Sequence, residues 1–159
     1  MDKSALITGI SGQDGAYLAR FLLGKGYRVW GMLARRSSDS LWRLRELGVA
    51  DQVGIVEGDL TDISSIDRAL EASSADEVYN LGAQSFVATS WQQPLLTAQV
   101  TGVGALNVLQ SFTLDLLRGP SRTATREPVL PLVGGTSYEK PIDNIGNKSQ
   151  PDYAAYADS

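Results

Sequence analysis

The chain of 159 residues contains no cysteine and no histidine. Without cysteine it has no disulfide, no thiol nucleophile and no thiolate ligand, although this count leaves its redox compartment open. Without histidine it lacks the commonest general base and the commonest metal ligand, so any acid–base chemistry would require Tyr, Lys, Asp or Glu. We therefore expect no metal site.

Positive charge and long apolar runs are also scarce. The net charge is −4 and no basic stripe occurs along the chain, which argues against nucleic-acid binding. No apolar stretch looks long enough to span a membrane, and the first one is short and ends in glycine, unlike a signal peptide. The composition, 43% hydrophobic and 20% charged, is typical of one globular domain. We expect a cytoplasmic protein without a nucleic-acid or membrane partner.

The chain does contain a glycine cluster directly after a short apolar run at residues 4–8. The cluster reads Gly9-Ile10-Ser11-Gly12-Gln13-Asp14-Gly15. A strand that ends in glycines and turns into a helix can hold a dinucleotide pyrophosphate, because the backbone approaches closely and the helix N-terminus offers free N–H groups. The spacing is G-x-x-G-x-x-G, and the alternative for the motif alone is a plain glycine-rich turn. The strand before it and the helical pattern after it favour the dinucleotide site.

Residues 1–112 alternate between predicted strands and predicted helices. We predict strands at 4–8, 28–34, 52–57 and 77–81. We predict helices at 16–25, at 40–47, after an N-cap at Thr61, and at 95–112. This alternation predicts an α/β fold, a Rossmann-type doubly wound parallel sheet in the order 3-2-1-4 with the glycine loop at its carboxyl edge.

Two of these helices carry further expectations. The first would place Tyr17, Leu18, Phe21 and Leu22 on one face. In the helix at 95–112, two glycines indicate either close packing against a neighbour or a break.

Residues 113–159 have a different composition. They contain five of the six prolines, and Pro131 interrupts the best strand candidate, at 129–133. The segment 143–159 is polar and small. We therefore expect an incomplete Rossmann sheet at 1–112 followed by an irregular tail at 113–159.

The second candidate binding segment is Arg35-Arg36-Ser37, just after the second predicted strand. Chains that bind NAD usually have an acidic residue near this point, which binds the ribose hydroxyls. Arginine fits a 2′-phosphate instead, through charge-assisted hydrogen bonds. The alternative is a solvated basic loop, and the offset from the glycine cluster favours NADP.

Two further loops follow the third and fourth strands. Asp59, before Leu60, could accept a hydrogen bond from adenine, or it could be a turn residue without a ligand. The small and polar residues after the fourth strand would let a cofactor lie against the backbone, or they could form an ordinary polar loop. These residues are Leu81, Gly82, Ala83, Gln84 and Ser85.

Several segments together resemble the extended short-chain dehydrogenase/reductases, and within them the GDP-mannose 4,6-dehydratase family. They are the string from Ala5 to Leu18, Arg35-Arg-Ser-Ser38, Trp42-Arg-Leu44, Val78-Tyr-Asn-Leu81 and Ala83-Gln-Ser-Phe-Val87. The resemblance runs from Met1 to about Phe112. It implies tightly held NADP, with the segment 9–14 on the pyrophosphate and the arginine pair on the 2′-phosphate. It also implies that Asp59 and Leu60 lie by the adenine and that the segment 81–85 lies on the nicotinamide side.

The family reaction oxidises C4 of the hexose of GDP-mannose, eliminates water across C5–C6 and returns the hydride to C6. Its later Tyr-x-x-x-Lys pair is absent here, since Phe21, Thr136 and Asn144 stand four residues before the candidate lysines. The run 137–139 echoes the family's Ser/Thr-x-Glu element only by chance. We therefore assign no catalytic residue, and we expect a family fragment that is inactive alone. The alternative is a non-catalytic nucleotide-binding or interaction module that associates with a full-length homologue.

Overall fold

A four-stranded parallel sheet forms the centre of the protein in the computed structural model, which describes residues 3–34 and 40–118. The strands are β1 (Ser4–Thr8), β2 (Arg28–Leu33), β3 (Val53–Glu57) and β4 (Glu77–Asn80). They lie in the order β3-β2-β1-β4, and each neighbouring pair is parallel. The predicted strands, their direction and their order are therefore confirmed.

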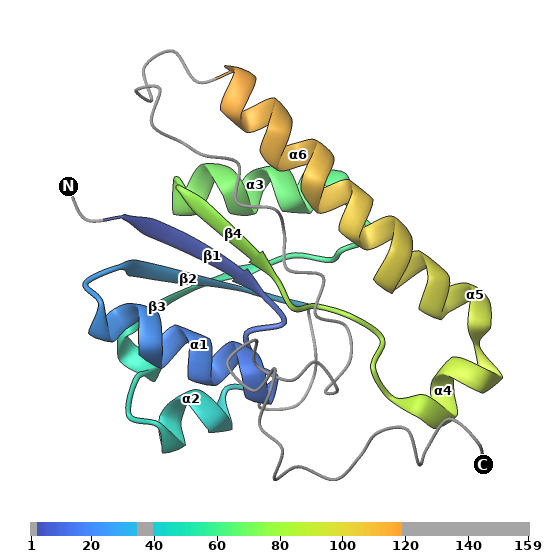
Figure 1. The fold of residues 1–159 in the computed structure, drawn as a ribbon, viewed down its shortest axis with the longest axis horizontal. Helices are drawn as coiled ribbons and strands as arrows, with labels where there is room; N and C mark the ends of the chain where they lie inside the picture. Colours follow the sequence, from blue (N-terminus) through green and yellow to red (C-terminus); the bar gives the residue numbers. More distant parts are fainter. Residues whose placement is uncertain (1–2, 35–39, 119–159) are drawn as a thin grey trace, which may run out of the picture.

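Helices cover both faces of this sheet. On one face lie α1 (Gln13–Gly24) and α2 (Trp42–Glu46), and on the other lie α3 (Ile63–Ser73) and α6 (Gly104–Arg118) (Figure 1). The shorter elements are a 3₁₀ turn η1 (Ala50–Gln52), α4 (Val87–Gln92), α5 (Pro94–Thr97) and a π-helical segment η2 (Ala98–Val103). Helices on both faces of a parallel sheet define the doubly wound Rossmann-type architecture that the sequence predicted.

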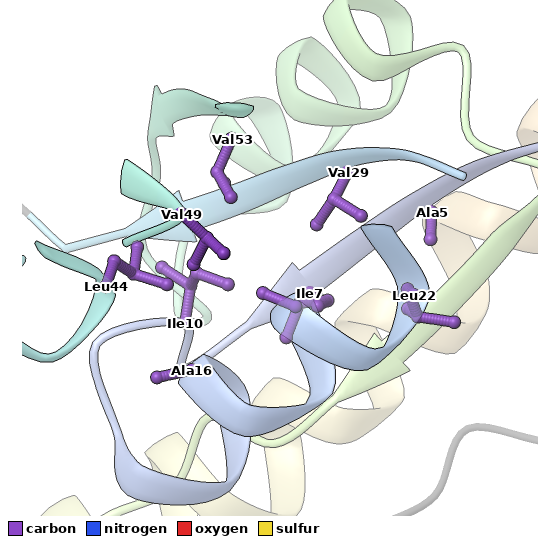
Figure 2. Packing of buried hydrophobic residues seen from close by; sticks show 10 residues of the cluster. Ala5, Ile7, Ile10, Ala16, Leu22, Val29, Leu44, Val49 and Val53 are labelled. Carbon is purple, nitrogen blue, oxygen red and sulfur yellow. The ribbon is translucent and has the colours of Figure 1, made fainter. Parts of the chain in front are cut away.

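Alternation along β1 divides the core into two layers. Ala5 and Ile7 point to the α1 side, whereas Leu6 points to the side of α3 and α6. Figure 2 shows the first layer, which contains Ile7 of β1, Leu22 of α1 and Leu44 of α2. Both faces of β1 are fully buried, as expected for the centre of a parallel sheet.

The buried face of α1 differs from our prediction. Of the four residues expected on one face, Leu22 is buried and Leu18 packs partly buried against the core, but Tyr17 and Phe21 are 57% and 59% exposed. The buried residues are Gly15, Ala16, Ala19 and Leu22. At Gly15 the helix approaches the glycine loop closely, since a Cβ there would lie 2.4 Å from the Gly9 carbonyl oxygen. The helix also begins three residues earlier than predicted, directly after Gly12.

The last predicted helix is longer than expected and changes type along its length. It begins with α5, passes through the π-helical η2 and continues as α6 to Arg118, beyond the boundary expected at residue 112. Its glycines differ in role: a Cβ at Gly104 would lie 2.8 Å from the Leu60 Cβ, whereas one at Gly102 would meet nothing within 4 Å. Close packing therefore explains Gly104, and Gly102 lies in the π-helical segment. Helix α4, just before α5, was not predicted.

The same helix corrects our expectation about membrane-spanning segments. The segment Pro94–Leu117 is 24 residues long and contains an 18-residue window with a mean hydropathy of 1.3, so by length and composition it could cross a membrane. Core helices of globular proteins pass the same test, and α6 buries Val108 and Phe112 against the sheet layer. Because α5, η2 and α6 follow one another without a break, the helix is longer than the one predicted at 95–112.

The N-terminus of α3 is capped by a different residue from the one predicted. The side chain of Asp62, not that of Thr61, accepts the hydrogen bond from the Ser64 N–H. Thr61 instead donates both its N–H and its hydroxyl to the Asp59 carboxylate, at 2.8 Å each. The first residues of the predicted irregular tail, 113–118, are helical and belong to α6, so the predicted start of the tail is wrong. The rest of the predicted tail, including 129–133 and 137–139, lies outside the described residues.

Candidate functional site

A cleft of 330 Å³ lies at the carboxyl ends of the strands. The loops that follow β1, β2, β3 and β4 all contribute to it. Its lining consists of Thr8, Gly9, Ser11, Gly12, Met32, Leu33, Ala34, Gly58, Asp59, Leu60, Leu81, Gly82, Ala83, Gln84, Ser85 and Val100. This is where ligands bind in open parallel sheets, and the volume falls in the range of small-molecule sites.

The glycine loop forms one wall of the cleft through Gly9, Ser11 and Gly12. Gly9 has a φ of +69°, and a Cβ there would lie 2.7 Å from the Leu81 carbonyl oxygen. The loops after β1 and β4 can therefore approach each other only because residue 9 is glycine. The loop leads directly into α1, whose N-cap is Gly12 without a capping side chain.

The other predicted residues of this loop lie outside the lining of the cleft. Ile10 is completely buried beneath the loop, where a Cβ at Gly31 would lie 2.5 Å from its side chain. Gln13 and Asp14 are exposed in the first turn of α1, and Gly15 is buried beside the loop. Gln13, Asp14 and Gly15 can offer the backbone N–H groups of the first turn of α1, which have no intrahelical partners.

A buried hydrogen-bond chain joins the ends of β1 and β4. The Thr8 hydroxyl donates to the Asn80 side-chain oxygen and accepts a hydrogen bond of 2.9 Å from the Gly82 N–H. Both Thr8 and Asn80 are buried. The chain fixes the start of the loop at 81–85 relative to the glycine loop. We had not assigned Thr8 to the site, although its place at the strand end next to Gly9 was visible in the sequence.

The loop after β3 places Asp59 and Leu60 in the lining, as we expected. Asp59 is exposed, and one of its carboxylate oxygens already accepts both hydrogen bonds from Thr61. The Leu60 carbonyl is held by the buried Asn107 side chain of α6, with an Nδ2–O distance of 2.9 Å. Asp59 thus forms the turn that we had named as its alternative role, while its position remains at the cleft.

The segment after β4 runs along the cleft from Leu81 to Ser85. The Gln84 N–H donates to the Thr101 hydroxyl of the π-helical segment, at 3.2 Å. The neighbouring Val100 lines the cleft itself. The long helix therefore supports two of the cleft loops, and this contribution could not be read from strand-end motifs. The predicted 2′-phosphate residues Arg35, Arg36 and Ser37 lie outside the described residues.

Within residues 3–34 and 40–118, the ionisable groups with shifted pKa values lie at the opposite end of the sheet. Burial raises the pKa of Glu77, but hydrogen bonds from Lys3, Tyr79 and Tyr27 outweigh it and lower the pKa overall. The same carboxylate raises the pKa of Lys3 through its hydrogen bond and charge. Burial, followed by the hydrogen bond to Glu77, raises the pKa of Tyr79. These shifts belong to a structural cluster and not to the cleft.

The fold and the cleft define a Rossmann-type protein of the short-chain dehydrogenase/reductase and epimerase class. A solved structure of this class, the UDP-glucose 4-epimerase of Thermus thermophilus in complex with NAD, is similar with a TM-score of 0.58 and 28% identity. The match covers 67% of this chain and 32% of the epimerase. The shared part is therefore one third of a longer enzyme fold.

The sequence comparisons narrow this class to one family. The chain matches the family described as GDP-mannose 4,6 dehydratase over residues 6–119, and it belongs to that family. It is 47% identical over 119 residues to a GDP-mannose 4,6-dehydratase of Vibrio cholerae, covering 72% of this chain and 32% of the relative. It is 45% identical over 122 residues to GDP-mannose 4,6 dehydratase 2 of Arabidopsis thaliana, a match that covers 71% of this chain and 33% of the relative. The chain thus spans about one third of these relatives.

Proposed function

We propose that this chain is the NADP-binding portion of a GDP-mannose 4,6-dehydratase and does not dehydrate GDP-mannose by itself. The observation that carries the proposal is the cleft, in which the glycine loop, Leu60 and the segment 81–85 converge at the carboxyl ends of the strands. Small residues and close backbone approach at this edge suit a dinucleotide. The family membership supplies the substrate class.

Each wall of the cleft suits a different part of the cofactor. The glycine loop and the start of α1 would hold the pyrophosphate, and Asp59 with Leu60 would lie by the adenine. The segment from Leu81 to Ser85 would lie along the nicotinamide. Bound NADP would supply hydride acceptance and return, while the described residues would bind and orient it.

The preference for NADP over NAD rests on Arg35 and Arg36. Charge-assisted hydrogen bonds to a 2′-phosphate contribute about 1.5–3 kcal/mol, which is roughly tenfold to a hundredfold in affinity. Isothermal titration calorimetry of the full chain should show tighter binding of NADP than of NAD. Replacing both arginines with Ala should remove most of this difference, while Arg20→Ala on the exposed side of α1 should not. Equal binding of both cofactors to the unmodified chain would rule the preference out.

The proposed lack of turnover follows from the acid–base groups that the chain does not contain. It has no histidine and no Tyr-x-x-x-Lys pair, and a missing acid–base group typically costs about 100- to 10,000-fold in rate. Purified chain with NADP and GDP-mannose should form no 4-keto-6-deoxy product above background. Turnover that disappears in Tyr138→Phe or Glu139→Gln would contradict the proposal.

A second candidate function is a non-catalytic interaction module that pairs with a longer homologue. The observation that favours it is the exposure of large apolar side chains on and beside α4 and α5. Phe86, Trp91 and Leu95 are 68%, 83% and 80% exposed. Size-exclusion chromatography of the chain mixed with a full-length family member should then show a complex, and two separate peaks would count against pairing.

A further inference from the structure

We infer that Arg43 is a positioning residue for the glycine loop, which orients the start of α1 toward a bound dinucleotide pyrophosphate. This inference deepens the proposed function and rests on it. The Arg43 Nη1 donates to the Ser11 carbonyl oxygen at 2.9 Å, between residues 32 positions apart in the sequence. Because the guanidinium is charged, this bond is stronger than one between neutral groups.

The peptide group between Ser11 and Gly12 is held at both of its ends. Its carbonyl accepts from Arg43, and its N–H donates to the Gly9 carbonyl at 2.9 Å. This peptide immediately precedes the first residue of α1, and Gly12 has no side chain with which to cap the helix. Its orientation therefore sets the direction of the free N–H groups that follow, which are the groups that bind anions.

Arg43 itself is held in place by its own helix. Its guanidinium lies 4.3 Å from the centre of the Trp42 ring, and the next residue, Leu44, is completely buried. Figure 2 shows Leu44 beside Ile10, the buried residue of the glycine loop. Helix α2 is thus anchored in the same core layer as the loop, and the Arg43 side chain connects the two on the surface side.

Loss of Arg43 should change the affinities for NAD and NADP differently from loss of Arg35 and Arg36. The pyrophosphate is common to NAD and NADP, so loss of Arg43 should weaken both cofactors by the same factor. Loss of a 2′-phosphate ligand would weaken NADP alone. The ratio of the two dissociation constants therefore separates a positioning residue from a residue that reads the phosphate.

The test uses the full chain with Arg43→Met, which keeps the aliphatic stem, and Arg43→Lys, which keeps the charge and a donor. Arg20→Met on α1 is the matched control. Calorimetry should show both cofactors weakened by roughly tenfold in Arg43→Met, since a hydrogen bond to a charged group contributes that order of affinity. Arg43→Lys should recover part of the loss, and the control should show none. Unchanged affinities in Arg43→Met, or a loss confined to NADP, would overturn the inference.

Amide hydrogen exchange tests the same role without any ligand. In ligand-free Arg43→Met, the amides of residues 12–15 should exchange faster than in the unmodified chain, while those of β1 stay unchanged. If the unmodified chain binds neither cofactor, the proposed function fails and exchange alone decides the role of Arg43. Equal exchange at residues 12–15 in both chains would then contradict it.

Discussion

The two ends of the same four strands are built from different chemistry. At the amino end, the buried Glu77 accepts hydrogen bonds from Lys3 at 2.9 Å, Tyr79 at 2.7 Å and Tyr27 at 3.1 Å. At the carboxyl end, most residues that line the cleft are glycines or have short side chains, and hydrogen bonds between side chains and the backbone join its loops. Long side chains fill one end, while the other stays open.

This difference reflects what each end must accommodate. A ligand that lies against the ends of parallel strands needs backbone at the surface, so side chains there must be small. The amino end does not have to accommodate a ligand. Polar side chains there can donate the hydrogen bonds that a buried carboxylate needs. Changes at the carboxyl end should therefore affect both folding and binding, whereas changes at the amino end should affect folding alone.

The largest expected effect is that of Gly9→Ala. The new Cβ would meet the Leu81 carbonyl oxygen at 2.7 Å, and φ at this position is +69°. Left-handed strain and overpacking together should lower the free energy of unfolding by about 3 kcal/mol or more, and dinucleotide affinity should fall with it. Urea denaturation and calorimetry measure the two losses.

A second glycine provides the matched control for this variant. Gly24 ends α1, and a Cβ there would meet nothing within 4 Å. Gly24→Ala should leave cofactor binding unchanged and raise the free energy of unfolding by up to about 1 kcal/mol. If Gly9→Ala were as stable as Gly24→Ala, the close approach of the two cleft loops would not be a constraint.

The sequence was sufficient to predict the sheet and the main loop of the site. Strand order followed from the alternation of strands and helices, and the glycine loop followed from its place after a buried strand. Contacts that depend on packing could not be predicted. Periodicity placed Tyr17 and Phe21 on one face with the buried Leu22, but Ala16 and Ala19 take the other buried positions of α1 and both aromatic rings are exposed.

Long-range polar contacts in the site were equally invisible in the sequence. The bonds from Arg43 to Ser11 and from Asn107 to Leu60 join residues 32 and 47 positions apart. Neither pair follows a local spacing rule, because the tertiary fold alone brings them together. The π-helical segment beside Gln84 also has no local signal that we recognised, beyond the two glycines near its end.

A smaller loss is expected from Glu77→Gln at the amino end. The amide keeps the size of the side chain but loses the charge that Lys3, Tyr27 and Tyr79 contact. Hydrogen bonds to a charged group contribute about 1.5–3 kcal/mol, so we expect a loss of about 2 kcal/mol in unfolding free energy. Dinucleotide affinity should not change. Glu71→Gln on the exposed side of α3 is the control, and a cofactor effect of Glu77→Gln would contradict the separation of the two ends.

The smallest expected effect is the acid dependence of the amino-end network. Burial raises the pKa of Glu77, but hydrogen bonds from Lys3, Tyr79 and Tyr27 lower it by more, to below the ordinary 4.5. The pKa of Glu77 is lower in the folded than in the unfolded chain. The contribution of its carboxylate to the free energy of unfolding is therefore fully present above the pKa of the unfolded chain. It is lost as the pH falls through the folded pKa.

The free energies of unfolding of the unmodified chain and of Glu77→Gln should therefore approach each other at acidic pH. Urea denaturation of the unmodified chain and of Glu77→Gln across the acid range should show a stability gap that is widest above pH 4.5 and narrows below it. All other carboxylates are common to both chains, so their titration cancels in the difference. A gap that stayed constant with pH would show that the ionisation of Glu77 is not the cause of the stability difference, and would contradict the prediction.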